Sequence, residues 1–240
     1  MNRRARILAE LELSPLYLRR TLAATEAAGD AGDAIPPPAS GAPALPTAAM
    51  NWTQLRSAIS ACTQCVLHQG RKQTVFGVGD EKAQWLFVGE GPGAEEDAKG
   101  EPFVGQAGRL LDNMLAAMGL KRGENVYIAN VVKCRPPGNR TPLPEEAKAC
   151  EPFLARQIEL IGPKLIVALG KVAAQNLLGT DATIASLRAQ LHFYRGTPLI
   201  VTYHPAYLLR TLNDKAKAWE DLCFAMATMQ ALKEQITVPT

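Results

Sequence analysis

Four cysteines are the residues of this 240-residue chain whose spacing most directly indicates chemistry. Cys62 and Cys65 form a Cys-x2-Cys pair, and Cys134 and Cys150 follow much later in the sequence. A structural zinc ion is usually bound by two close cysteine pairs, and only one is present here. Four cysteine thiolates are the ordinary ligands of a 4Fe–4S cluster. The spacing therefore favours an iron–sulfur cluster, while a zinc site and four unrelated free thiols remain alternatives.

The rest of the composition is compatible with reduced thiols. Glu10 and Glu12 interrupt the apolar run that a secretory signal would need, so we expect the cysteines to stay reduced in the cytoplasm, where disulfides are rare. No segment approaches 18 consecutive apolar residues, and no membrane-spanning helix is expected. The fifth cysteine, Cys223, is expected to be buried in a C-terminal helix. The net charge of +3 by itself indicates no class of partner.

A glycine-rich, acidic loop, VGEGPGAEEDAKGEPFVG, occupies residues 88–105. The Gly-x-Gly-x-x-Ala spacing that begins at Gly89 is similar to a dinucleotide-binding fingerprint. However, Pro92 removes an N–H group from the turn, and the acids at 95–97 place negative charge where a pyrophosphate would lie. Such a loop is better suited to a cationic transition state, such as the oxocarbenium-like one formed when a glycosidic bond is cleaved.

Three other side chains stand out because of their place in the sequence. Asn130 lies in an apolar strand-like segment, His204 begins the motif HPAYLLR, and Phe103 lies in a glycine- and proline-containing loop. Taken singly, Phe103 is typical of a core residue and His204 of a residue that caps a sheet. Residues 121–140 contain five Lys or Arg against one acid, which is typical of either phosphate contacts or an ordinary solvated loop.

Alternating strands and helices are expected from residue 50 to residue 240. Strands are predicted at 85–90, 126–132, 165–169 and 198–203, and helices at 106–118, 141–161, 171–178 and 214–235. Apolar strands separated by helices indicate a parallel sheet that is covered on both faces. In such sheets a ligand binds beyond the carboxyl ends of the strands, where the acidic loop and the HPAYLLR loop both fall.

The N-terminal part of the chain has a different character. Residues 1–20 have the spacing of a short amphipathic helix, and residues 21–49 contain 11 Ala and 5 Pro, the composition of a disordered linker. A frayed extension is the default interpretation of the helix, and docking to a repair or replication partner is an alternative.

Together, GEGPGAEED, PFVGQAG, ANVVKCRPPGNRTP, HPAYLLR and the cysteine spacing resemble the family 4 uracil-DNA glycosylases, the iron–sulfur branch of that superfamily. The resemblance covers about residues 55–232. It implies a three-layer α/β/α fold with a four-stranded, largely parallel sheet, and a 4Fe–4S cluster on Cys62, Cys65, Cys134 and Cys150. It also implies a monofunctional enzyme of base excision repair, which flips uracil out of DNA, hydrolyses its N-glycosidic bond and leaves an abasic site. We accordingly expect uracil-containing DNA as substrate, a monomer, and a cytoplasmic location at the nucleoid.

The resemblance also implies roles for residues of the pocket. Phe103 corresponds to the aromatic residue that stacks on the flipped uracil, Asn130 to the residue that reads its edge, and His204 to a histidine near uracil O2. Gly91 lies where the backbone approaches the base. Glu90 and Glu96 match acidic positions implicated in catalysis, and Asp97 also remains a candidate for the carboxylate that orients water.

A second group of residues is expected to contact DNA. The HPAYLLR loop suggests a wedge that fills the hole left by the flipped base, with Tyr207 and Leu208 as candidates and Leu208 slightly favoured. Arg135, Arg140 and Arg210 are expected on phosphates.

Two other functions are compatible with part of these features. One is a uracil-DNA trap that becomes covalently attached to DNA. That superfamily branch has a nucleophilic His in a basic insertion after the second strand, and the corresponding loop here, KCRPPGNRTP, has no His. The other is electron transfer through the cluster, which would leave the acidic loop and the Asn and His without a purpose.

Overall fold

A mixed six-stranded sheet lies at the centre of the computed structural model, which describes residues 47–237. The four inner strands run parallel in the order β3 (Val126–Asn130), β2 (Trp85–Gly89), β4 (Leu165–Leu169) and β6 (Thr197–Thr202). The short edge strands β1 (Val78–Gly79) and β5 (His192–Tyr194) pair antiparallel with β3 and β6. The predicted α/β class is confirmed, but the predicted number of four strands is too small. The edge strands have two and three residues, which is too short for a pattern to indicate them.

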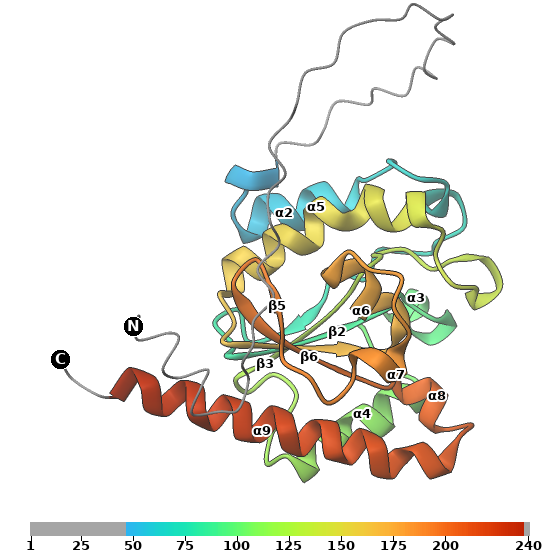
Figure 1. Cartoon of the computed structure of the whole chain (residues 1–240). Helices are drawn as coiled ribbons and strands as arrows, with labels where there is room; N and C mark the ends of the chain where they lie inside the picture. Colours follow the sequence, from blue (N-terminus) through green and yellow to red (C-terminus); the bar gives the residue numbers. More distant parts are fainter. Residues whose placement is uncertain (1–46, 238–240) are drawn as a thin grey trace, which may run out of the picture. The chain divides into compact units, whose positions relative to one another are not determined.

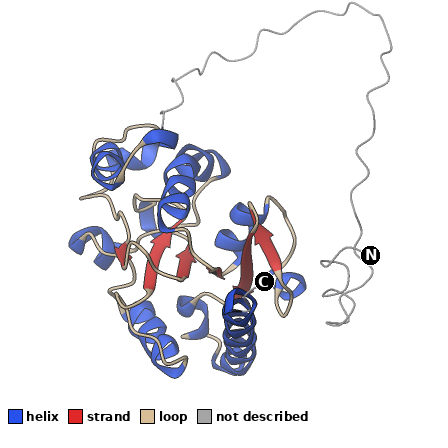
Figure 2. Cartoon of the chain, turned by 90° about the vertical axis from the view of Figure 1, so that its left-hand side faces the viewer, coloured by secondary structure: helices blue, strands red, loops and turns tan. Residues whose placement is uncertain are grey.

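Helices cover both faces of the sheet (Figures 1 and 2). One face carries α2 (Trp52–Ser60), α5 (Pro144–Ile161) and α6 (Lys171–Leu178), and the other carries α4 (Gln106–Ala117) and α9 (Lys215–Thr237). Along β2, Leu86 and Val88 pack toward the first set of helices, whereas Trp85 and Phe87 pack toward the second. A strand that is buried on both faces needs apolar residues at every position. This explains the unbroken WLFVG sequence.

Helix α5 begins at Pro144, three residues after the predicted start at Thr141. Leu143 is the N-cap and has an extended backbone, Pro144 takes the first helical position, and the Glu146 carboxylate accepts the Leu143 N–H at 2.8 Å. Thr141 is therefore left in the preceding loop, with consequences for the site described below. The helix ends at Gly162 in a left-handed conformation.

Short helices connect the larger elements. They are η1 (Thr47–Ala49), η2 (Val66–Gln69), α3 (Ala94–Lys99), η3 (Pro137–Asn139), α7 (Ile184–Leu187), α8 (Pro205–Leu208) and η4 (Leu212–Asp214). The expected N-terminal helix, and all but the last three residues of the expected linker, lie outside the described residues. Within residues 47–237 no helix has the length and hydropathy needed to span a membrane. Cys223 on α9 is exposed and not buried as predicted, because it faces away from the α9 contacts that Leu222 and Ala225 make with the sheet.

The strand order creates a crevice at one edge of the sheet. The connection after β2 passes through α4 on one face, and the connection after β4 passes through α6 on the opposite face. Adjacent parallel strands whose connections diverge in this way leave an opening beyond their carboxyl ends. The loops that follow β2, β3, β4 and β6 meet at this opening.

Candidate functional site

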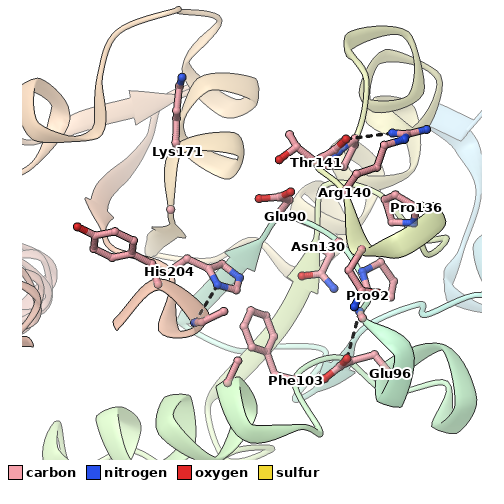
Figure 3. A pocket seen from close by; sticks show the side chains of 18 of the residues that line it. Glu90, Pro92, Glu96, Phe103, Asn130, Pro136, Arg140, Thr141, Lys171 and His204 are labelled. Atoms are coloured by element: carbon pink, nitrogen blue, oxygen red, sulfur yellow. Dashed lines mark hydrogen bonds between the residues drawn. The ribbon is translucent and has the colours of Figure 1, made fainter. Parts of the chain in front are cut away.

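A pocket of about 680 Å³ occupies this opening. Each inner strand contributes to its lining: Glu90 follows β2, Asn130 ends β3, Gly170 follows β4, and His204 follows β6. Figure 3 shows the side chains of Glu90, Asn130, Phe103 and His204 arranged around the same space. The volume is typical of a pocket for a small organic group.

Phe103 forms one wall of the pocket and has an unusual backbone. Its φ of 55° is left-handed, which is costly for an aromatic residue. The Arg122 guanidinium donates to the carbonyl oxygens of Pro102 and Phe103 at 2.9 and 2.8 Å and thereby holds this turn. The Phe103 and His204 ring centroids are 5.5 Å apart at an angle of 30°. The ring is thus presented beside the histidine with little freedom to move.

Gly89, the last residue of β2, permits this arrangement by having no side chain. A Cβ at Gly89 would lie 2.5 Å from Asn130 Oδ1 and 2.5 Å from Phe103 Cζ. Both side chains therefore use the space directly beside the Gly89 backbone.

Asn130 presents an unpaired acceptor within the pocket. The residue is 2% exposed, and its Oδ1 atom has no hydrogen-bond partner in the described part of the chain. A buried unpaired polar atom costs about 1–3 kcal/mol, so a ligand N–H group would be bound favourably here. The main-chain carbonyl of Asn130 accepts a 2.8 Å hydrogen bond from the Nζ of Lys133, a fully buried lysine.

His204 is held as a neutral imidazole. It is the N-cap of α8, and its Nδ1 accepts the Ala206 N–H at 3.1 Å. Burial, with a smaller contribution from Arg210, lowers the pKa of His204 to about 4. Because Nδ1 serves as an acceptor, the ring proton lies on Nε2. The residue is therefore a neutral hydrogen-bond donor.

The three candidate carboxylates differ in their surroundings. Glu96 accepts the N–H groups of Gly93, Val104 and Gly105 at 3.1, 2.9 and 3.0 Å. Asp97 is buried and accepts the Lys72 N–H at 2.9 Å.

Glu90 lines the pocket as Glu96 does, but within the described residues its carboxylate accepts no main-chain N–H group. Burial raises the pKa of its carboxyl, and the Thr141 hydroxyl opposes this increase by hydrogen bonding. Glu90 is therefore the one of the three carboxyls whose oxygens remain available to a ligand or a water molecule.

The basic residues at 121–140 do not form one continuous cationic surface. Lys121 pairs with Glu124, and Arg122 with Asp112. Lys133 is buried, and Arg140 forms a bidentate pair with Glu146. Arg135 donates to Asn139 at 2.7 Å. Counting charges over residues 121–140 does not predict these ion pairs, because Asp112 and Glu146 lie outside that segment and the pairing of Lys121 with Glu124 depends on a turn.

The HPAYLLR loop is at the mouth of the pocket, but Leu208 does not project from it. Leu208 is 1% exposed and packs against Tyr203 and Ala218. Tyr207 donates its hydroxyl to Asp214 at 2.6 Å and stacks on Tyr203 at 5.2 Å. These contacts bury Leu208 and hold the half-buried Tyr207 side chain against Tyr203 and Asp214.

Several exposed side chains follow Leu208 in the sequence. Leu209 is 39% and Leu212 62% exposed, and Arg210, also exposed, lines the pocket. The sequence could not distinguish Leu208 from Leu209, because the orientation of a single-turn helix decides which leucine is buried.

The four predicted cysteine ligands come together at a second, smaller cavity. Cys62, Cys65, Cys134 and Cys150 all line it. The Arg71 guanidinium donates to Cys134 Sγ at 3.0 Å, and the Lys133 main-chain N–H donates to Cys150 Sγ at 3.3 Å. N–H groups directed at sulfur favour the thiolate form.

The protonation of these thiols depends on what binds them. Burial raises the pKa of Cys65 and Cys134, and that of Cys150 to about 12. Within the described range, no three Cys, His, Asp or Glu side chains form a group that could hold a single metal ion. In a cubane cluster each cysteine binds a different iron, so the sulfurs lie further apart than around one ion. Four sulfurs around a shared cavity, with N–H donors to two of them, fit a cluster.

The sheet and the polar pocket beyond the carboxyl ends of its strands define an α/β protein with a site for a small polar group. A model of the uracil DNA glycosylase superfamily matches residues 76–223, which include every residue of the pocket described above. The chain belongs to the uracil DNA glycosylase superfamily.

Individual relatives place it more narrowly. A type-4 uracil-DNA glycosylase of Archaeoglobus fulgidus is 49% identical over 63% of this chain and 79% of the relative. The type-4 enzyme of Thermotoga maritima is 48% identical over 66% of this chain and 83% of the relative. That of Pyrobaculum aerophilum is 44% identical over 72% and 92%. The resemblance inferred from the motifs is thereby confirmed.

Proposed function

We propose that this protein is a monofunctional uracil-DNA glycosylase of the type-4, iron–sulfur class, which acts on DNA as a monomer. The observation that carries this proposal is Asn130 Oδ1, which is buried without a hydrogen-bond partner among the described residues and lies beside Phe103 and His204 in a pocket of a uracil DNA glycosylase superfamily member. A repair enzyme of this kind would work at the nucleoid.

Asn130 is matched to uracil by its hydrogen-bonding groups. Oδ1 accepts the uracil N3–H, and the amide N–H₂ group donates to O4. Cytosine reverses both groups and would leave two buried polar mismatches. Pockets based on such hydrogen bonds discriminate by about 10⁴-fold. Stacking on Phe103 offsets part of the few kcal/mol needed to extrude a base from the helix.

Cleavage requires charge stabilisation on both sides of the bond. As the N1–C1′ bond breaks, uracil takes the electron pair and becomes an anion with charge on O2, to which the His204 Nε2–H donates. The deoxyribose acquires oxocarbenium character, and the Glu90 carboxylate stabilises it and orients the attacking water. The water oxygen bonds to C1′ and its proton passes to Glu90. Gly91 brings its backbone close to the base.

We assign Glu96 a positioning role and not a catalytic one, because its oxygens are engaged by three main-chain N–H groups around Phe103. We assign DNA contacts to Arg210 and Arg135, which lie on loops at the pocket and form no carboxylate pair within the described residues. The exposed Leu209 replaces Leu208 as the wedge residue.

The four cysteines would hold a 4Fe–4S cluster. When bound, the cluster would cross-link the segment from Cys134 to Cys150 to the one around Cys62 and Cys65, and so fix the loop that borders the pocket.

The assignment of the carboxylates is tested by release of free uracil from uracil-containing DNA. Glu90→Gln is expected to lower the single-turnover rate by about 10²-fold or more without changing the Tm greatly. Glu96→Gln is expected to lower the Tm as well, because it loses a charged acceptor for three N–H groups. Equal rates for Glu90→Gln and the unaltered protein would contradict the role of Glu90.

A further inference from the structure

An ion pair between a partly exposed arginine and a buried carboxylate holds the loop that borders the pocket onto helix α5. The Arg140 guanidinium donates to both oxygens of Glu146, at 2.8 and 2.6 Å, and the Glu146 side chain is 1% exposed. The same guanidinium donates to the carbonyl of Thr141 at 3.0 Å. Bidentate pairs of this kind fix geometry as well as charge. The partly exposed Arg140 side chain is thus held by Glu146 and in turn holds the main chain of Thr141.

Thr141 and Glu90, which both line the pocket, face each other across it (Figure 3). The Thr141 hydroxyl is directed toward the Glu90 carboxyl, and hydrogen bonding from this hydroxyl lowers the pKa of the carboxyl against the effect of burial. Catalytic contacts are often long before a substrate binds and shorten afterwards. A hydroxyl that donates to a carboxylate stabilises the charged form and restricts its orientation.

We propose that Thr141 is a positioning residue for Glu90, which it orients through its hydroxyl, and that the Arg140–Glu146 pair holds Thr141 in place. This inference rests on the proposed glycosylase function and gives the segment between Cys134 and Cys150 a direct role at the pocket. Other titratable or charged groups lining the same pocket are Glu96, Arg140, Lys171, Tyr203, His204, Tyr207 and Arg210.

The test is the pH dependence of single-turnover uracil release. Protonation of the Glu90 carboxylate at low pH lowers the rate, and this decrease forms the acid limb of the pH–rate profile. The Glu90→Gln variant identifies the limb as that of Glu90 because its profile lacks the limb. In Thr141→Val the Glu90 carboxylate loses its hydroxyl partner, so the limb is expected to move upward by about one pH unit. Thr141→Ser keeps the hydroxyl and is expected to keep the limb in its original place. Arg140→Met, which frees Thr141, is expected to move it upward as well.

The outcomes separate this inference from the proposed function. If the unaltered protein releases no uracil, the proposed function fails. If it is active but Thr141→Val has an unmoved limb, or a rate lowered equally at every pH, the positioning role is overturned. An unmoved limb in Arg140→Met overturns the part assigned to the ion pair. Circular dichroism checks the fold of each variant, and Thr141→Ala serves if the valine variant does not fold.

Discussion

The Phe103 ring occupies the space where a side chain of residue 89 would lie, and only a glycine leaves this space free. A Cβ on Gly89 would lie 2.5 Å from the Phe103 ring. The same Cβ would lie 2.5 Å from Asn130 Oδ1. A single glycine thereby sets the distance between the surface on which a base would stack and the amide that would read it. This relationship gives the pocket a sharp test.

Replacing Gly89 by alanine is expected to displace the Phe103 ring and the Asn130 amide together. Small displacements at a catalytic site cost about 100-fold in rate, so uracil release should fall by about that factor. Gly70→Ala is the matched control, since a Cβ at Gly70 has nothing within 4 Å and φ there is −105°. Similar rates for the two variants would mean that the Gly89 contact does not shape the active pocket.

Asn130→Asp is expected to weaken the discrimination between uracil and cytosine. A carboxylate accepts a hydrogen bond from the cytosine amino group, where uracil offers only the O4 acceptor. Excision rates on otherwise identical oligonucleotides with one uracil or one cytosine give the ratio. We expect it to fall from about 10⁴, with some cleavage at cytosine. An unchanged ratio would remove Asn130 from the reading role.

Cys134→Ala is expected to abolish the visible absorbance of a bound cluster and to loosen the loop that carries Arg140 and Thr141. Cys223→Ala removes a thiol from the same protein at an exposed position remote from the cavity, and it should retain full colour. Absorbance spectra and iron content of both purified variants decide the point. Full colour in Cys134→Ala would show that the ligand set is wrong.

His204 is expected to remain neutral well below the pH at which an exposed histidine is protonated. Its folded-state pKa of about 4 lies below the ordinary value of about 6.5. The folded state therefore disfavours protonation, and its stability from this group decreases as the pH falls from about 6.5 to about 4. NMR titration of the imidazole signals, assigned with His204→Gln, measures this pKa. Titration of His204 near pH 6.5 would contradict the neutral-donor role.

The sequence predicted those parts of the fold that depend on local patterns. β4 and α6 have the predicted limits at 165–169 and 171–178. β4 is an uninterrupted apolar run, α6 consists mostly of good helix formers, and a glycine directly follows each of them. The edge strands β1 and β5 were missed because they exist only through pairing with β3 and β6. The start of α5 was placed too early because Thr141 and Pro142 imitate a cap that Leu143 and Pro144 provide.

The sequence predicted which side chains line the pocket, but not the hydrogen bonds and packing contacts that position them. Asn130, Phe103, His204 and Glu90 do line one pocket. The engagement of Glu96 by main-chain N–H groups follows from the fold of the loop around Phe103, to which its spacing in the sequence gives no clue. The burial of Lys133 and Leu208, and the pairing of Arg140 with Glu146, depend in the same way on tertiary packing.

The most direct test of the central claim uses an end-labelled oligonucleotide that carries one uracil, incubated with the purified protein and then treated with alkali. A monofunctional glycosylase predicts strand breakage only after alkali, at the uracil and not at a thymine or cytosine in the same position. An intact strand after incubation with protein that carries its cluster would contradict glycosylase activity and leave a protein that binds uracil-containing DNA without cleaving it.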